Sequence, residues 1–160
     1  MRSSVGEVRE IVRAATAEAQ RRRDRAVGSE HVLLGALSDP VGIGVQTLGL
    51  GVEEVRFALH KLDQEALGSV GVDPELAVAA ASGARRRTGR LRLSNGAKQL
   101  LHAAVLQSKE LGDGDIGARH VLLALLATKP PDPAAVLLQH LVVDLDAARA
   151  SLLPARANGT

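Results

Sequence analysis

The sequence contains no cysteine, no tryptophan and no tyrosine, and its only phenylalanine is Phe57. Without cysteine the chain forms no disulfide, has no thiolate nucleophile and offers no cysteine ligand to zinc. Without aromatic side chains it lacks the stacking platforms with which many proteins hold single-stranded nucleic acid. Its apolar residues are mainly alanine, leucine and valine, which favours closely packed helices over a β-sandwich.

Long hydrophobic segments are also missing. No apolar run approaches the roughly 20 residues that a membrane-spanning helix needs. The N-terminal segment from Met1 to Glu7 has no hydrophobic signal region. Together with the lack of cysteine, these absences lead us to expect a cytoplasmic protein with no membrane partner.

Acidic residues are absent between Glu75 and Glu110, although the formal net charge of the chain is only +2. The cations of this stretch are Arg85, Arg86, Arg87, Arg90, Arg92, Lys98 and Lys109. The charge pattern therefore predicts a local basic patch on a chain that is close to neutral as a whole.

Four helices are predicted in the first 68 residues. The S-x-x-E spacing of Ser4 and Glu7 predicts a capping box at the start of the first helix. Ser29 is predicted to cap a short, leucine-rich second helix that stops before Asp39 and Pro40. Helical spacing of apolar residues predicts a third helix over about 41–48 and a fourth from 52 to near 68.

The same pattern begins again at Ser94, which is predicted to cap a further helix. Residues 115–126 then repeat residues 26–37 in register, so that Gly28 aligns with Gly117 and His31 with His120. After two consecutive prolines the second copy carries a four-residue insertion, and Asp144 is predicted to cap the last helix. The constant alignment indicates a duplicated unit.

We therefore expect an all-α fold of about eight helices, in which two four-helix repeats, 1–68 and 94–154, pack about a pseudo-twofold axis. One repeat alone buries little apolar surface, so the two should form one compact domain. Residues 69–93 are expected to be a basic linker with a short helix from Asp73 and Pro74 to Ala81, followed by an exposed arginine-rich loop. Residues 155–160 are expected to be a flexible tail.

The stretch from Gly28 through Glu30 and His31 to Leu37 resembles the signature of the Clp N-terminal repeat, which is a glycine, a small hydroxyl residue, Glu-His and a leucine-rich helix. The resemblance continues in Gly42-Ile43, Leu48-Gly49-Leu50 and Glu110-Leu111-Gly112 and spans about residues 7–153. Two ordered copies make the match specific, and the fold it implies agrees with the helices expected from the pattern alone.

The resemblance implies a binding function. In this family the domain stands at the front of ring-forming AAA+ unfoldases and receives substrates and adaptor proteins. The sequence has no GxxxxGK[ST] phosphate-binding loop. We therefore expect a free-standing, non-enzymatic module without catalytic residues, metal or cofactor, which acts as a receptor, decoy or regulator of a Clp unfoldase.

Family members of the Gram-positive type bind phosphoarginine, and the motif glutamate of each repeat holds the guanidinium group. The resemblance places such a ligand site at Ser29 and Glu30, where a carboxylate meets the guanidinium and helix N–H groups meet the phosphoryl group. Arg119 occupies the glutamate position in the second repeat. Because like charges repel, we expect one phosphoarginine site, with the site at Arg119 silent or taking an anion.

Two alternative functions remain open. In the first, a groove between the repeats binds a partner helix or peptide, and Glu30 only stabilises the helix dipole. In the second and least favoured, the linker arginines bind nucleic acid. His31 and His120 have no second ligand three or four residues away, so we expect structural hydrogen bonds at the repeat interface and no metal or catalytic role.

Overall fold

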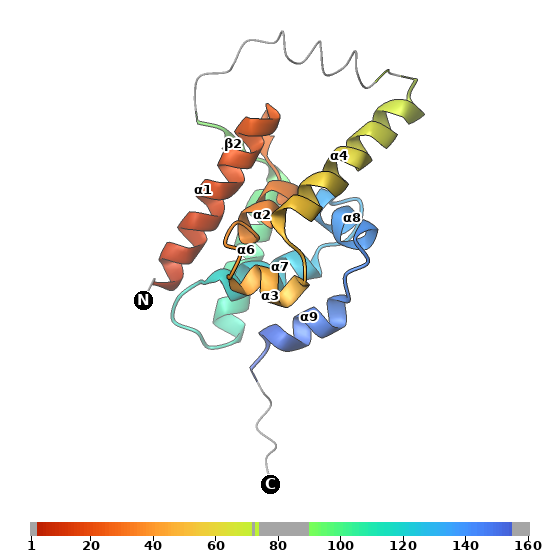
Figure 1. The fold of residues 1–160 in the computed structure, drawn as a ribbon. Coiled ribbons are helices and arrows are strands. Elements are labelled where there is room, and N and C mark those ends of the chain that lie inside the picture. Colours follow the sequence, from red (N-terminus) through yellow and green to blue (C-terminus); the bar gives the residue numbers. More distant parts are fainter. Residues whose placement is uncertain (1–2, 72, 74–89, 155–160) are drawn as a thin grey trace.

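The computed structural model describes residues 3–71, 73 and 90–154. This part of the chain forms eight helices and two very short strands (Figure 1). None of its helices combines the length and the apolar character needed to cross a membrane. The predicted linker helix beyond Asp73, the arginines at 85–87 and the tail at 155–160 lie outside the described residues.

The first repeat contains four helices and one strand. They are α1 (Ser4–Arg22), β1 (Ala26–Val27), α2 (Ser29–Ala36), α3 (Ile43–Leu48) and α4 (Val52–Ser69). All four helices were expected, but two predicted caps are wrong by one residue. Ser3 caps α1, because its hydroxyl accepts the N–H of Gly6 at 3.2 Å, and Gly28, not Ser29, is the N-cap of α2.

The second repeat also has four helices and one strand, but its strand precedes the first helix instead of following it. They are β2 (Arg92–Leu93), α6 (Asn95–Glu110), α7 (Ala118–Ala127), α8 (Pro133–His140) and α9 (Leu145–Leu152). Ser94 and Asp144 are confirmed as the N-caps of α6 and α9, where their side chains accept the N–H groups of Ala97 and Ala147. The inserted residues of this repeat include the cap and start of α8, which is longer than α3.

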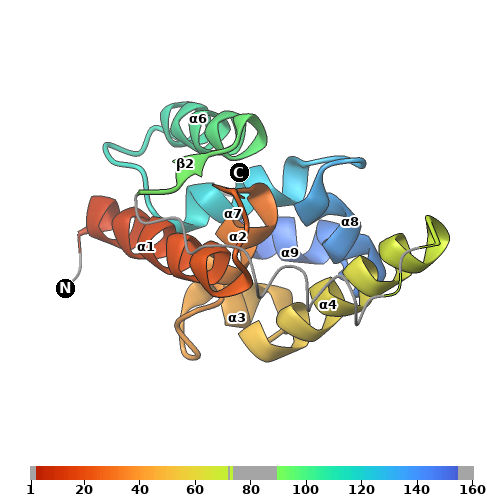
Figure 2. The same cartoon turned by 90° about the horizontal axis from the view of Figure 1, so that it is seen from above.

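The two motif helices, α2 and α7, lie at the centre of the molecule with the other helices around them (Figure 2). Leu33 and Leu34 of α2 and Leu122 and Leu123 of α7 are all 0% exposed. A helix that is apolar on every side needs neighbours on every side, and here α1, α6, α8 and α3 provide them. The leucine-rich motifs are therefore the shared core of both repeats.

Contacts between the repeats occur in matched pairs. Helix α1 contacts α7 as α6 contacts α2, α3 contacts α7 as α8 contacts α2, and α3 contacts α9 as α8 contacts α4. This reciprocity confirms the expected pseudo-twofold arrangement. The sequence pattern did not predict β1 and β2, which pair in parallel with Ala26 beside Arg92 and Val27 beside Leu93.

Helices α1, α2 and α3 approach one another very closely at two glycines. A Cβ atom on Gly35 would lie 2.3 Å from the carbonyl oxygen of Ile11, and one on Gly44 would lie 2.2 Å from that of Ala36. Both distances are far below van der Waals contact with main-chain atoms. The first repeat therefore requires glycine at these two positions to bring its helix backbones together.

Candidate ligand-binding site

Each repeat holds its motif histidine in the same two hydrogen bonds. His31 Nδ1 accepts the N–H of Gly28 at 2.8 Å, and its Nε2 lies 2.7 Å from Asp24. His120 Nδ1 accepts the N–H of Gly117 at 2.9 Å, and its Nε2 lies 2.7 Å from Asp113. Because Nδ1 accepts in both, each ring carries its proton on Nε2 and donates it to the aspartate.

The histidines make structural hydrogen bonds as expected, but these bonds do not lie at the repeat interface, where they were expected. Both rings are buried and bond within their own repeat, where they close the N-terminus of the motif helix, and neither bonds across the repeat interface. The aspartates that complete the arrangement were not predicted from the sequence, although they occur seven residues before each histidine. That repeated Asp-His spacing was the available signal.

The two aspartates have lowered pKa values for slightly different reasons. Burial raises the pKa of Asp24, but hydrogen bonds from His31 and Arg22 lower it by more. Hydrogen bonds from His120 and then Arg119 lower the pKa of Asp113. Both carboxylates are therefore held in the charged form that the neighbouring donors require.

Asp24, Glu30 and His31 place one potential metal ligand each within 4.8 Å of the others. A metal ion needs a free lone pair on the imidazole. His31 offers none, because Nδ1 accepts the Gly28 N–H and Nε2 carries the proton donated to Asp24. The cluster is better explained as a hydrogen-bonded helix start than as a metal site.

Glu30 lies in the first turn of α2 and folds back over Gly28. A Cβ atom built on Gly28 would be only 2.3 Å from Glu30 Oε2. The Glu30 side chain is 19% exposed, and its Oε1 is 3.7 Å from His31 Nδ1, which has no proton to donate. Its Oε2 is buried against Gly28 and has no hydrogen-bond partner among the described residues. A buried carboxylate oxygen without a donor is costly, so the Glu30 carboxylate would gain by turning outward to a ligand that supplies N–H groups.

Ser29 is occupied by a contact between the repeats. Its hydroxyl donates to Asp132 Oδ1 at 2.7 Å and accepts the N–H of Ala134 at 3.2 Å. The residue is only 2% exposed. Ser29 therefore joins the start of α2 to the start of α8. Because its hydroxyl is used in this contact, Glu30 is the side chain at this helix start that remains for a ligand.

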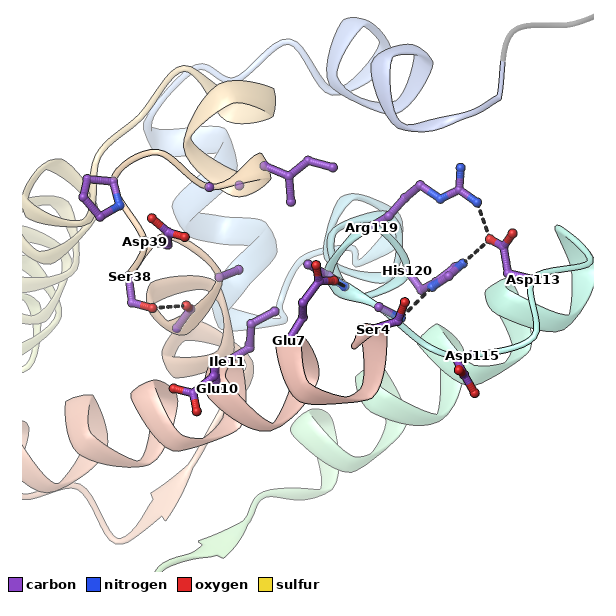
Figure 3. A pocket seen from close by; sticks show the side chains of 18 of the residues that line it. Ser4, Glu7, Glu10, Ile11, Ser38, Asp39, Asp113, Asp115, Arg119 and His120 are labelled. Carbon is purple, nitrogen blue, oxygen red and sulfur yellow. Dashed lines mark hydrogen bonds and ion pairs between the residues drawn. The ribbon is translucent and has the colours of Figure 1, made fainter. Parts of the chain in front are cut away.

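Arg119 stands at the start of α7, in the place that Glu30 has in α2. Its guanidinium donates to Asp113 Oδ2, the same oxygen that binds His120 (Figure 3). This ion pair compensates for a cation at a helix N-terminus, which the helix dipole disfavours. In the first repeat Arg22 has the corresponding function, because it donates to Asp24 at 2.9 Å.

A cleft of about 970 Å³ opens between the repeats beside Arg119 (Figure 3). Its walls are the start of α1, the loop between α2 and α3, and the start of α7. The lining includes Glu7, Glu10, Asp39, Asp113, Asp115 and Arg119. Ser29 and Glu30 are not among the lining residues, so the structure does not bring the three predicted site residues together.

Glu7 reaches across this cleft and closes the N-terminus of α7. Its Oε2 accepts the N–H of Ala118 at 3.1 Å. The predicted capping box with Ser4 is wrong, because α1 is capped by Ser3 and the Glu7 side chain is used in the other repeat. No local pattern could reveal a partner 111 residues away.

The cleft exists because the two repeats differ at equivalent positions. Ser29 and Asp132 bond where the start of α2 meets the start of α8. At the pseudo-symmetric corner, where α7 meets α3, Ala118 takes the place of Ser29 and the N-cap of α3 is Gly42, so neither residue has a polar side chain to bridge the two helix starts. One corner is thus closed by a hydrogen bond and the other remains open.

The fold defines an all-α class of protein built from two pseudo-symmetric repeats with a Gly-x-x-His motif at the start of each central helix. The Clp repeat N-terminal domain family model matches residues 6–141, and the chain belongs to this family. The structure of the N-terminal domain of the chaperone ClpD from Arabidopsis thaliana covers 91% of this chain and 92% of its own, with a TM-score of 0.65 and 19% identity. The Hsp104 N-terminal domain from Candida albicans has a TM-score of 0.52 and 14% identity. These two likenesses concern the fold.

The chain is similar in sequence to only one part of each of the following curated relatives. An ATP-dependent Clp protease ATP-binding subunit ClpA homolog from Guillardia theta is 25% identical over 146 residues, which are 89% of this chain and 16% of the relative. Chaperone protein ClpC3, chloroplastic, from Oryza sativa subsp. japonica is 29% identical over 115 residues, or 70% of this chain and 10% of the relative. The chain therefore spans about a sixth or less of the length of these relatives.

Proposed function

We propose that this chain is a non-enzymatic binding module of the Clp protein-degradation system in the cytoplasm. It captures substrate degradation signals or adaptor proteins, and it acts as a receptor, a decoy or a regulator of a Clp unfoldase. Membership of the Clp repeat N-terminal domain family and the names of the curated relatives support this proposal. The ligand site that we propose lies at Glu30 and takes a phosphoarginine side chain.

The observation that carries the site is the unpartnered Glu30 Oε2. A guanidinium group is planar and presents N–H donors in a fork that fits a carboxylate. The main-chain N–H groups of Ser29 and Glu30 also have no acceptor within the described residues. Free N–H groups at a helix start bind phosphoryl oxygens, so both halves of phosphoarginine find a complementary group here.

The second repeat supplies neither half of this site. Arg119 replaces the glutamate, and Glu7 already accepts the N–H of Ala118, which is the counterpart of Ser29. A guanidinium would meet like charge, and a phosphoryl group would have to displace a carboxylate. One ligand per chain is the expected stoichiometry.

Titration calorimetry with an arginine-phosphorylated peptide tests this site. The wild-type chain should bind one peptide, and Glu30→Gln should weaken binding by at least about tenfold, because a charge-assisted hydrogen bond is lost. Glu65→Gln, which removes an exposed glutamate of α4, is the matched control and should leave binding unchanged. The unphosphorylated peptide should bind much more weakly.

Three results would contradict the phosphoarginine site: no binding by a chain that is folded, binding of two peptides per chain, or guanidinium density beside Arg119 in a crystal soaked with phosphoarginine. Glu30→Gln should fold like the wild type, because Glu30 makes no side-chain hydrogen bond within the described part of the chain. Circular dichroism of each variant checks that it is folded.

A second candidate function rests on the cleft of about 970 Å³ between the repeats. A cleft of this size accommodates a peptide or one face of a partner helix. In that case Glu30→Gln should leave capture of partners from a cytoplasmic extract intact, whereas the first proposal predicts its loss. The nucleic-acid alternative rests on the linker arginines, of which only Arg90 and Arg92 lie in the described chain.

A further inference from the structure

A second cavity, of about 380 Å³, lies on the second repeat, away from Glu30 and from the cleft at Arg119. The end of α7 and the faces of α8 and α9 enclose it. Its apolar lining includes the buried Leu126, Ala135 and Leu138 and the part-exposed Leu145. Lys129 and Arg149 also line it, and no acidic residue of the described chain does.

Arg149 is the repeat counterpart of Arg56. The residues before and after the two arginines correspond: Val55 and Ala148 are both buried, and so are Leu59 and Leu152. Gly49 and Val142 both have positive φ at the turn before the helix. The two arginines therefore start from equivalent places on α4 and α9.

Their surroundings differ in charge. Arg56 donates to Glu53 of its own helix and to the buried Glu18 of α1, and the contact with Glu18 joins α4 to α1. The residue of α6 that corresponds to Glu18 is Gln107, which carries no charge. Neither Arg149 nor Lys129 makes an ion pair or a side-chain hydrogen bond with any residue that the structure describes. The second repeat thus keeps the cation and has lost its internal anion.

We propose that this cavity binds the C-terminal residue of a polypeptide that ends in an aliphatic side chain. The side chain would contact Leu126, Leu138 and Leu145, and the free α-carboxylate would bind Lys129 and Arg149. Two cations beside apolar lining residues are complementary to a ligand that carries a carboxylate and an aliphatic group a few atoms apart. This proposal goes beyond the function proposed for Glu30 and does not depend on it.

Chain termini fit this cavity better than other carboxylates do. An aspartate or glutamate side chain brings a carboxylate but has only one or two methylene groups and no branched aliphatic end to lie against the leucines. A long fatty acid brings both but needs more apolar space than a cavity of about 380 Å³, which is near the lower end of the roughly 300–1,000 Å³ of ligand pockets. One aliphatic residue with its terminal carboxylate matches both the volume of the cavity and the charge of Lys129 and Arg149.

Fluorescence anisotropy with a labelled peptide ending in Ala-Leu tests the proposal on the intact chain. The free acid should bind, and the same peptide with a C-terminal amide should bind at least about tenfold more weakly, because a charge-assisted hydrogen bond is lost. Arg149→Gln and Lys129→Gln should each weaken binding of the acid and not of the amide. Arg13→Gln, an exposed arginine of α1 outside the cavity, is the matched control.

The acid–amide comparison uses the wild-type chain, so a variant that fails to fold does not decide the outcome. Equal binding of acid and amide, binding of palmitate without binding of the peptide, or no binding at all would overturn the proposal. So would variants that lose thermal stability but not peptide affinity, because the two cations would then serve only to neutralise the C-terminal ends of α7 and α9. Glu30→Gln should leave this binding unchanged, which separates it from the phosphoarginine test.

Discussion

At the residue scale, the motif histidines are scaffold groups with both ring nitrogens in use. Each accepts a main-chain N–H at the start of a buried helix and donates to an aspartate outside it. The aspartate in turn binds an arginine, Arg22 in one repeat and Arg119 in the other. The arginine comes from a different position in each repeat, yet the charge at the aspartate is balanced in both.

Asp24→Asn should destabilise the fold in a pH-dependent way. The variant lacks the charged acceptor of His31 and Arg22, so its free energy of unfolding at neutral pH should fall by about 1–3 kcal/mol. The pKa of Asp24 is lowered from 3.8. Its contribution is therefore complete above the pKa of the unfolded chain and is lost as the pH falls through the lower, folded pKa. Urea unfolding over a pH series measures the difference.

The stability gap between wild type and Asp24→Asn should thus close at acid pH. Asp115→Asn is the control, because Asp115 is exposed and has no hydrogen-bond or ion-pair partner among the residues described. A gap that stayed constant from neutral to acid pH would show that the charge of Asp24 is not what stabilises the helix start.

At the element scale, close helix contacts depend on glycine. Gly35→Ala should cost about 1–3 kcal/mol, because its Cβ atom would clash with the carbonyl oxygen of Ile11 and push α1 away from α2. Gly68→Ala is the control, since it lies in α4 with no atom near its Cβ position. That change should be neutral or stabilise the chain by up to about 1 kcal/mol. Thermal unfolding distinguishes the two, and equal melting temperatures would contradict the close-packing explanation.

Helix α4 shows how the elements differ between the repeats. Its first half packs on the body through Val55 and Leu59, and its second half projects away from the other helices (Figures 1 and 2). Helix α9, its counterpart, ends at Leu152, which is the repeat counterpart of the buried Leu59. The ion pair of Arg56 with Glu18 joins the packed first half of α4 to α1.

At the scale of the whole molecule, the two repeats share one core. Helices α2 and α7 are buried against elements of both repeats, and Ser29 bonds to Asp132 across the interface. A fragment of residues 3–71 would expose the α2 leucines that α7 and α8 cover, and it is too short to replace that burial. We expect this fragment to lack a cooperative thermal transition by circular dichroism, while the full chain shows one. A cooperative transition in the fragment would contradict a shared core.

Most of the fold could be predicted from the sequence because its signals are local. Caps such as Ser94 and Asp144, the Gly28 and Gly117 motif starts and the leucine spacing all act within one or two turns of helix. The errors occur where a side chain leaves its own helix. Ser29 and Glu7 are good capping residues by type, but each is used by a helix of the other repeat.

The sequence by itself determined the two repeats, the order of their helices and the exchange of Glu30 for Arg119, because each depends on residues close together in the chain. Only the tertiary structure decided that Glu7 fills the start of α7, that Ser29 and Asp132 close one corner while the other stays open, and that Arg149 lacks the partner of Arg56. Hydrogen bonds and ion pairs between distant segments depend on where the packed helices place each side chain. No spacing along the chain encodes that placement.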